Sequence, residues 1–71
     1  MNGNRIQVSL DGQPQQIPAA TPLAGLLAAL SLAPESVATA LNGQFVAREA
    51  RGQAWLKDGD QVLLFKPIVG G

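Results

Sequence analysis

Three dipeptides that favour tight turns divide this chain of 71 residues and constrain its fold more than any other feature. They are Asp11-Gly12, Asn42-Gly43 and Asp58-Gly59. Glycine, asparagine and aspartate tolerate the positive φ angles that two-residue hairpin turns require. Each dipeptide therefore predicts a tight turn next to a strand, and the chain is expected to be rich in short strands.

The segments beside these turns have the residue patterns of β-strands. Residues 5–10 alternate polar and apolar side chains, as a strand with one buried face does. Residues 60–65 end in a continuous apolar run, which favours a central strand with one face on the core and the other partly exposed. Pro14 indicates an edge position for the second strand, since proline cannot donate to a neighbouring strand. Strands are predicted over residues 5–10, 13–17, 37–41, 44–46 and 60–65.

A single helix is predicted between the second and third of these strands. Thr21 is a suitable N-cap residue, and Pro22 suits the first helical position because its missing N–H would have had no partner there. Four leucines then follow at the spacing of one helical face, which indicates a side buried against the sheet. They are Leu23, Leu26, Leu27 and Leu30.

Residues 47–57 are rich in charged and polar side chains and are predicted to be mainly loop. Trp55 and Leu56 are expected to anchor this loop on the core, because an exposed tryptophan would be costly in so small a domain. Arg48 and Arg51 are interpreted as solvated surface charges, in preference to polar contacts at the rim of an interface.

The resulting order, β-β-α-β-β-β, predicts an α+β fold with a mixed sheet of about four to five strands packed on one main helix. The last strand is expected beside the first. One helix covers only one face of such a sheet, so the other face is expected to be available to a partner. We predict a folded domain over residues 1–66 and a flexible C-terminal tail over residues 67–71.

The composition argues against several classes of function. The chain has no His, Cys or Tyr, which removes the common metal ligands and the usual general base. Its five basic and five acidic residues cancel, so nucleic acid or an anionic membrane has no electrostatic reason to bind. It has neither a membrane-spanning run nor the pattern of a signal peptide. We therefore expect a cytoplasmic protein, monomeric on its own, without a metal and without catalytic side chains.

The sequence ends in Gly70-Gly71, after an apolar strand and the arm Lys66-Pro67-Ile68-Val69. Glycine has no Cβ, so such residues can pass through a channel too narrow for any other residue. The only group that this end offers to chemistry is the Gly71 carboxylate. We expect another protein's active site to act on that carboxylate, with Gly70, Val69 and Ile68 passing into the site.

Together these features resemble the ubiquitin-like sulfur carrier family of bacteria, of the ThiS/MoaD type, and most closely its thiamine-biosynthesis branch. The matching segments are the hairpin around Asp11-Gly12, residues 21–30, 40–48 and 58–65, and the terminal Gly70-Gly71. They cover nearly the whole chain in the expected order and imply a ubiquitin-like β-grasp fold. The chain differs from the family pattern at two places. Ala47 stands where the family often has a proline, and Lys66-Pro67 adds a proline to the arm.

The resemblance implies a function for the C-terminus. An adenylating enzyme would activate the Gly71 carboxylate with ATP and Mg²⁺, and AMP would then be the leaving group. Sulfur from a persulfide donor protein would replace AMP and give a terminal thiocarboxylate. Thiazole synthase would receive this sulfur for the thiazole of thiamine. The carrier itself would hold no cofactor stably.

A docking surface is expected on the exposed side of the last strand, drawn from Val62, Leu64 and Phe65. For each of these three residues, burial in the core and contact with a partner are equally favoured. Pro67, and Ile68 and Val69 beyond it, would extend the surface along the arm. Two β-branched apolar residues beyond the last strand have little core left to bury them.

Three other functions fit parts of the same pattern. A ubiquitin-like modifier, conjugated to other proteins through Gly71, would be activated in the same way. A sulfur carrier of another pathway, such as the molybdopterin type, would share the C-terminal chemistry, although a somewhat longer chain would be expected. A β-grasp binding or regulatory module would need no free Gly-Gly end.

Overall fold

Two of the three predicted turns have the backbone of two-residue hairpin turns. The φ angles are 50° and 85° at Asp11 and Gly12, and 51° and 84° at Asn42 and Gly43. Positive φ at both central residues matches the right-handed twist of the strands that such a turn joins. In the Asp58-Gly59 pair only Gly59 has a positive φ, of 90°, and this turn leads from a loop into the last strand.

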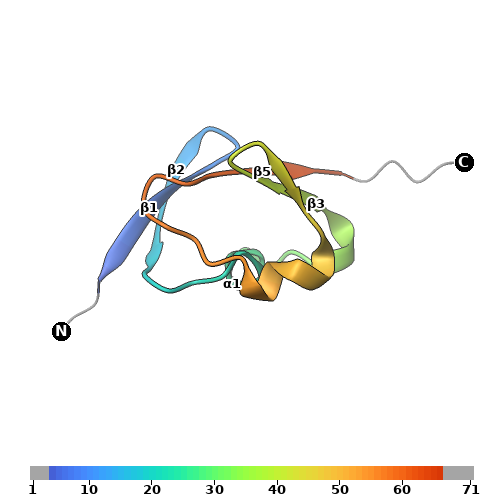
Figure 1. The fold of residues 1–71 in the computed structure, drawn as a ribbon, viewed down its shortest axis with the longest axis horizontal. Coiled ribbons are helices and arrows are strands. Elements are labelled where there is room, and N and C mark those ends of the chain that lie inside the picture. The colour runs from blue at the N-terminus through green and yellow to red at the C-terminus, as the bar shows by residue number, and fades with distance from the viewer. Residues whose placement is uncertain (1–3, 67–71) are drawn as a thin grey trace, which may run out of the picture.

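The computed structural model describes residues 4–66. These residues form five strands, one α-helix and two 3₁₀ helices, η1 and η2 (Figure 1). In chain order the elements are β1 (Arg5–Leu10), β2 (Gln13–Pro18), α1 (Leu23–Ala29), η1 (Pro34–Ser36), β3 (Ala38–Leu41), β4 (Gln44–Val46), η2 (Arg48–Gln53) and β5 (Gln61–Phe65). Of the predicted tail, residues 67–71 lie outside the described part of the chain.

The five strands form one mixed sheet in the order β2-β1-β5-β3-β4. The last strand, β5, lies in the centre, parallel to β1 and antiparallel to β3. Helix α1 packs on one face of this sheet (Figure 1). The predicted α+β fold is confirmed, including the position of the last strand beside the first.

The core forms between α1 and the sheet. Three of the four predicted leucines on α1 are buried: Leu23, Leu26 and Leu27. Leu23 and Leu26 pack with side chains from both ends of the sequence, including Val8 of β1 and Val62 of β5. The helix and the sheet therefore share a single core, to which the first and last strands both contribute.

The predicted N-cap of α1 is wrong. Pro22 is the N-cap, with the extended angles φ −78° and ψ 164°, and no side chain caps the helix. The helix thus begins one residue later than predicted, and Thr21 lies too far back to reach its first N–H groups. Its hydroxyl instead donates a hydrogen bond of 2.6 Å to the carbonyl of Pro18 in the preceding turn.

The segment predicted as loop contains the six-residue 3₁₀ helix η2, and one of its two predicted anchors is wrong. Leu56 is buried as predicted, but Trp55 is 55% exposed. Trp55 forms a β-bridge with Pro22, and the flanking N–H groups of Leu23 and Leu56 bond across it. In extended backbone, successive side chains point to opposite sides, so Leu56 points inward and Trp55 outward.

Candidate functional site

Strand β5 carries the three strand residues predicted for docking, and the structure separates them. Val62 is fully buried, with 0% of its surface exposed, and belongs to the core between α1 and the sheet. Leu64 is half-buried and packs against the same core. Phe65 is 50% exposed. The placement of Val62 on a docking surface is therefore wrong, because alternation along β5 turns it toward the helix.

The outer side of β5 is formed by Leu63 and Phe65, and it continues onto the neighbouring strands. Ala40 of β3 pairs with Leu63 on one side and with Phe45 of β4 on the other. Ala38 pairs with Phe65. Directly paired residues share a face of the sheet, so these side chains form one group, the outer apolar face: Ala38, Ala40, Phe45, Leu63 and Phe65.

The outer apolar face includes two large residues that were not among those predicted for docking. Leu63 is 40% exposed and Phe45 is 72% exposed. Because successive side chains of a strand point to opposite faces, assigning Val62 to the core would have placed Leu63 on the outer face. Finding Phe45 requires the pairing of β3 with both β4 and β5, which a single sequence does not give.

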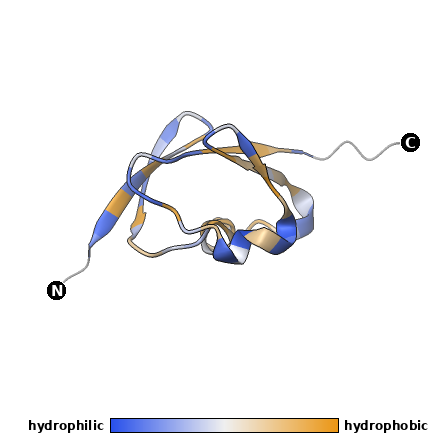
Figure 2. Cartoon of the chain, viewed as in Figure 1, coloured by the Kyte–Doolittle hydropathy of each residue, from blue (hydrophilic) through white to orange (hydrophobic). Residues whose placement is uncertain are grey.

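An exposed cluster of this kind makes the outer apolar face a candidate surface for docking. Soluble monomeric proteins rarely expose a contiguous apolar patch of more than a few hundred Å², and patches above that size mark interaction sites. Here α1 covers the opposite face of the sheet, so Phe45, Leu63 and Phe65 have nothing over them among residues 4–66. In Figure 2 the hydrophobic colour covers most of β5.

Polar side chains from two turns fix the beginning of β5. Asp60 accepts hydrogen bonds from the Lys57 N–H at 2.7 Å and from the side-chain amide of Asn42 at 3.0 Å. Asn42 in turn accepts a bond of 2.9 Å from the Gln61 N–H. Asp58 accepts one of 2.8 Å from the Gln7 N–H in β1. The two turns thus set the register of β5 against its neighbours.

Asp11 supports the second half of β5, where β1 has already ended. The Asp11 N–H donates to the Val62 carbonyl at 2.9 Å. Its carboxylate then accepts a hydrogen bond of 3.0 Å from the Leu64 N–H. One turn residue therefore supplies hydrogen bonds to β5 where the partner strand β1 has ended.

Arg51 is buried, which corrects its interpretation as a solvated surface charge. It is 3% exposed and donates to the Thr39 hydroxyl at 3.0 Å, the Pro34 carbonyl at 2.8 Å and the Val37 carbonyl at 2.6 Å. Burial lowers the pKa of its guanidinium below the ordinary value, and the charge of Arg48 lowers it further. Arg51 thus ties η2 to β3 and to the segment around η1, whereas Arg48 is exposed as predicted.

The described residues contain neither a cluster of metal ligands nor a helix that could span a membrane. Within residues 4–66, no three His, Cys, Asp or Glu side chains are grouped so that they could hold a metal ion. The helices of this part of the chain are also too short or too polar to cross a bilayer. The predicted reactive segment lies beyond the described part of the chain: Pro67, Ile68, Val69, Gly70 and Gly71.

Comparisons with known proteins agree with the sequence pattern. The profile of the ThiS family matches residues 2–71. The sulfur carrier protein ThiS of Escherichia coli is 38% identical over 66 residues, which are 93% of this chain and 100% of that protein. A thiazole synthase of Magnetococcus marinus is also 38% identical over 66 residues, but this chain spans only 20% of its length.

Solved structures share the fold. The crystal structure of the thiamine biosynthesis protein ThiS from Geobacter metallireducens has a TM-score of 0.79 at 33% identity, covering 93% of this chain and 100% of that one. A ubiquitin of Caldiarchaeum subterraneum has a TM-score of 0.53 at 19% identity, covering 99% and 100% of the two chains. The second match concerns the fold alone, and together the two confirm the ubiquitin-like β-grasp fold.

Proposed function

Because the chain belongs to the ThiS family, we propose that it is a sulfur carrier for the biosynthesis of the thiamine thiazole. The observation that carries the proposal is the match to the E. coli carrier over that protein's full length. The terminal Gly70-Gly71, within the region that the family profile matches, supplies the carboxylate that such a function needs.

The reaction takes place at the Gly71 carboxylate in the active site of a partner. A carboxylate oxygen attacks the α-phosphorus of ATP, bound with Mg²⁺ by an adenylating enzyme, and pyrophosphate leaves. The outer sulfur of a persulfide on a donor protein then attacks the acyl carbon, AMP leaves, and an acyl disulfide joins the carrier to the donor. A second thiol of the partner proteins cleaves the S–S bond, forms a disulfide with the donor sulfur and releases the carrier. The product is a C-terminal thiocarboxylate, and no side chain of the carrier takes part in bond making or breaking.

The folded domain contributes by holding the C-terminal segment at the partner's site. Docking through the outer apolar face raises the effective concentration of the Gly71 carboxylate there. The large exposed side chains of this face, Phe45, Leu63 and Phe65, support this role. Ile68, Val69 and Gly70 would occupy the channel that leads to the active site, and Pro67 would stiffen the arm.

Thiazole synthase is the proposed recipient of the sulfur. The M. marinus protein of that name contains a segment 38% identical to this chain, within a polypeptide about five times as long. A carrier-like segment joined to a synthase in one polypeptide would be held at a high effective concentration beside it. This supports a direct transfer from the thiocarboxylate of the carrier to the synthase.

Intact-mass spectrometry tests the proposal. The full chain is produced together with an adenylating enzyme of the ThiS pathway and a persulfide donor. We expect one oxygen to be replaced by one sulfur at the C-terminus, in an ATP-dependent reaction. The variant lacking Gly71 serves as the control and should keep its mass.

Two other outcomes would contradict the carrier function. An unchanged mass without ATP turnover would overturn activation of Gly71. Conjugates of higher mass with other proteins, formed in place of the thiocarboxylate, would identify a protein modifier instead.

A further inference from the structure

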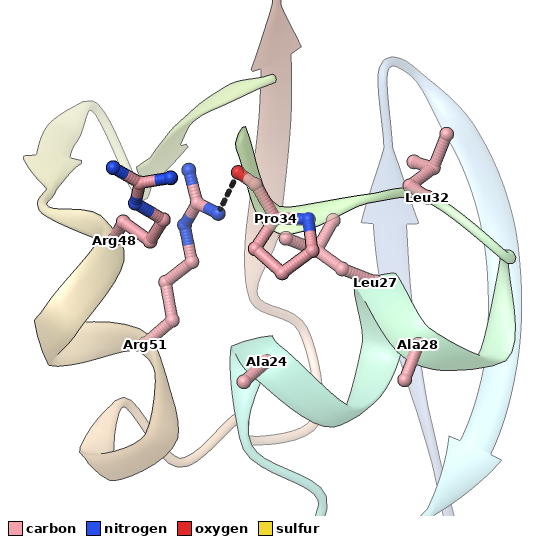
Figure 3. A pocket seen from close by; sticks show the side chains of 7 residues that line it. All are labelled: Ala24, Leu27, Ala28, Leu32, Pro34, Arg48 and Arg51. Atoms are coloured by element: carbon pink, nitrogen blue, oxygen red, sulfur yellow. Dashed lines mark hydrogen bonds between the residues drawn. The ribbon is translucent and has the colours of Figure 1, made fainter. Parts of the chain in front are cut away.

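A cavity of about 320 Å³ lies on the helix side of the sheet, between α1 and the two 3₁₀ helices (Figure 3). Its wall is mostly apolar, and the guanidinium groups of Arg48 and Arg51 complete it. Small-molecule sites in proteins begin at about 300 Å³ and combine an apolar lining with a few polar groups. The apolar residues are Ala24, Leu27, Ala28, Leu32 and Pro34.

Two like charges meet at one end of this cavity. Figure 3 shows the guanidinium groups of Arg48 and Arg51 next to each other, beside Pro34. The charge of Arg48 lowers the pKa of Arg51, as expected for neighbouring cations, while Glu49 acts in the opposite direction. The two arginines also line a second, adjoining cavity, to which Glu35 contributes.

The positive charge at this end is only weakly compensated by the described residues. Arg51 is almost fully buried, yet its three hydrogen-bond acceptors are a hydroxyl and two carbonyls, all neutral. Among residues 4–66, two of its five N–H groups have no hydrogen-bond acceptor. Within residues 4–66, the Arg48 side chain makes no hydrogen bond. A buried cation is normally paired with an anion, because loss of hydration makes an unpaired charge costly.

We infer that this cavity binds a small organic anion. The apolar body of the ligand lies against Leu27, Leu32 and the alanines of α1. Its carboxylate, sulfonate or phosphate group accepts hydrogen bonds from Arg48 and from the free N–H groups of Arg51. The cavity lies on the helix side of the sheet, and the adjoining cavity, which shares Arg48 and Arg51, is also lined by Ala38 and Phe45 of the outer apolar face.

A titration followed by NMR tests the inference, with 2-naphthalenesulfonate as the probe. We expect saturable shift changes at the methyl groups of Leu27 and Leu32 and at the Arg51 Nε–H. The neutral analogue 2-naphthalenemethanol should bind about tenfold more weakly, because it cannot form charge-assisted hydrogen bonds. Equal affinity for the two probes would overturn the assignment of an anion site.

Two matched pairs of variants locate the site. Ala28 and Ala29 are both exposed on α1, but only Ala28 lines the cavity. Ala28→Leu should abolish probe binding, and Ala29→Leu should leave it unchanged. Arg48→Gln should weaken binding about fivefold, whereas Arg5→Gln, at an exposed position of β1, should have no effect. Retained binding in Ala28→Leu, or an unchanged affinity in Arg48→Gln, would show that the probe binds elsewhere and would overturn the proposal.

Discussion

At the scale of single residues, Arg51 has a structural role that composition does not suggest. Arginine is seldom fully buried, and a charged segment such as 48–53 is normally solvated. Here one guanidinium satisfies the carbonyls of Pro34 and Val37 and the hydroxyl of Thr39. Its planar fork spreads five donors over three nitrogens, so it can reach three acceptors on two segments.

Replacing Arg51 should therefore destabilise the fold. Arg51→Met removes the charged donor from the carbonyls of Pro34 and Val37, and we expect a loss of about 2–4 kcal/mol in the free energy of unfolding. The matched variant Arg48→Met changes an exposed side chain and should stay within about 0.5 kcal/mol. Urea denaturation measures both values. Similar losses in the two variants would contradict the structural role of Arg51.

Asp11 carries a second prediction at this scale. Its carboxylate is the acceptor for the Leu64 N–H, beyond the end of β1. Asp11→Ala should cost about 1–2 kcal/mol, and the Leu64 amide should exchange faster with deuterium. Asp11→Asn keeps a side-chain oxygen and tolerates the positive φ of 50°, so its amide exchange should remain close to the original. Equal exchange at Leu64 in both variants would show that the bond contributes little.

At the scale of elements, the strands and the helix could be predicted, but which side chains point outward could be predicted only in part. The turn dipeptides and the leucine spacing are local signals, and they place β1 to β5 and α1 within a few residues. The continuous apolar run of β5 hides its alternation, so Val62 was not distinguished from Leu63. Phe45 joins the candidate site only through the pairing of three strands. The burial of Arg51 likewise depends on contacts between distant segments.

The outer apolar face gives a prediction for this scale. Leu63→Asp and Phe65→Asp place charges on the face without removing a core residue, so the rate of thiocarboxylate formation should fall at least about tenfold. Trp55→Asp is the matched control, because Trp55 is similarly exposed but lies in the loop that bridges to Pro22. Unfolding curves should confirm that all three variants remain folded. A decrease of equal size in Trp55→Asp would contradict a docking role for this face.

At the scale of the whole molecule, β5 joins two otherwise separate pairs of strands. In the order β2-β1-β5-β3-β4, the hairpins β1–β2 and β3–β4 are each formed locally, and β5 alone connects them. It also supplies Val62 to the core beside Leu23 and Leu26. A domain of this size has little stability to spare, since a single small core is only marginally sufficient.

We therefore expect the chain to fold only after its last strand is present. A variant that ends at Asp60 lacks β5 and should give the amide spectrum of an unfolded chain. A variant that ends at Lys66 keeps every core residue of the described domain, so its free energy of unfolding should lie within about 0.5 kcal/mol of the original. A cooperative unfolding transition in the shorter variant would contradict this account.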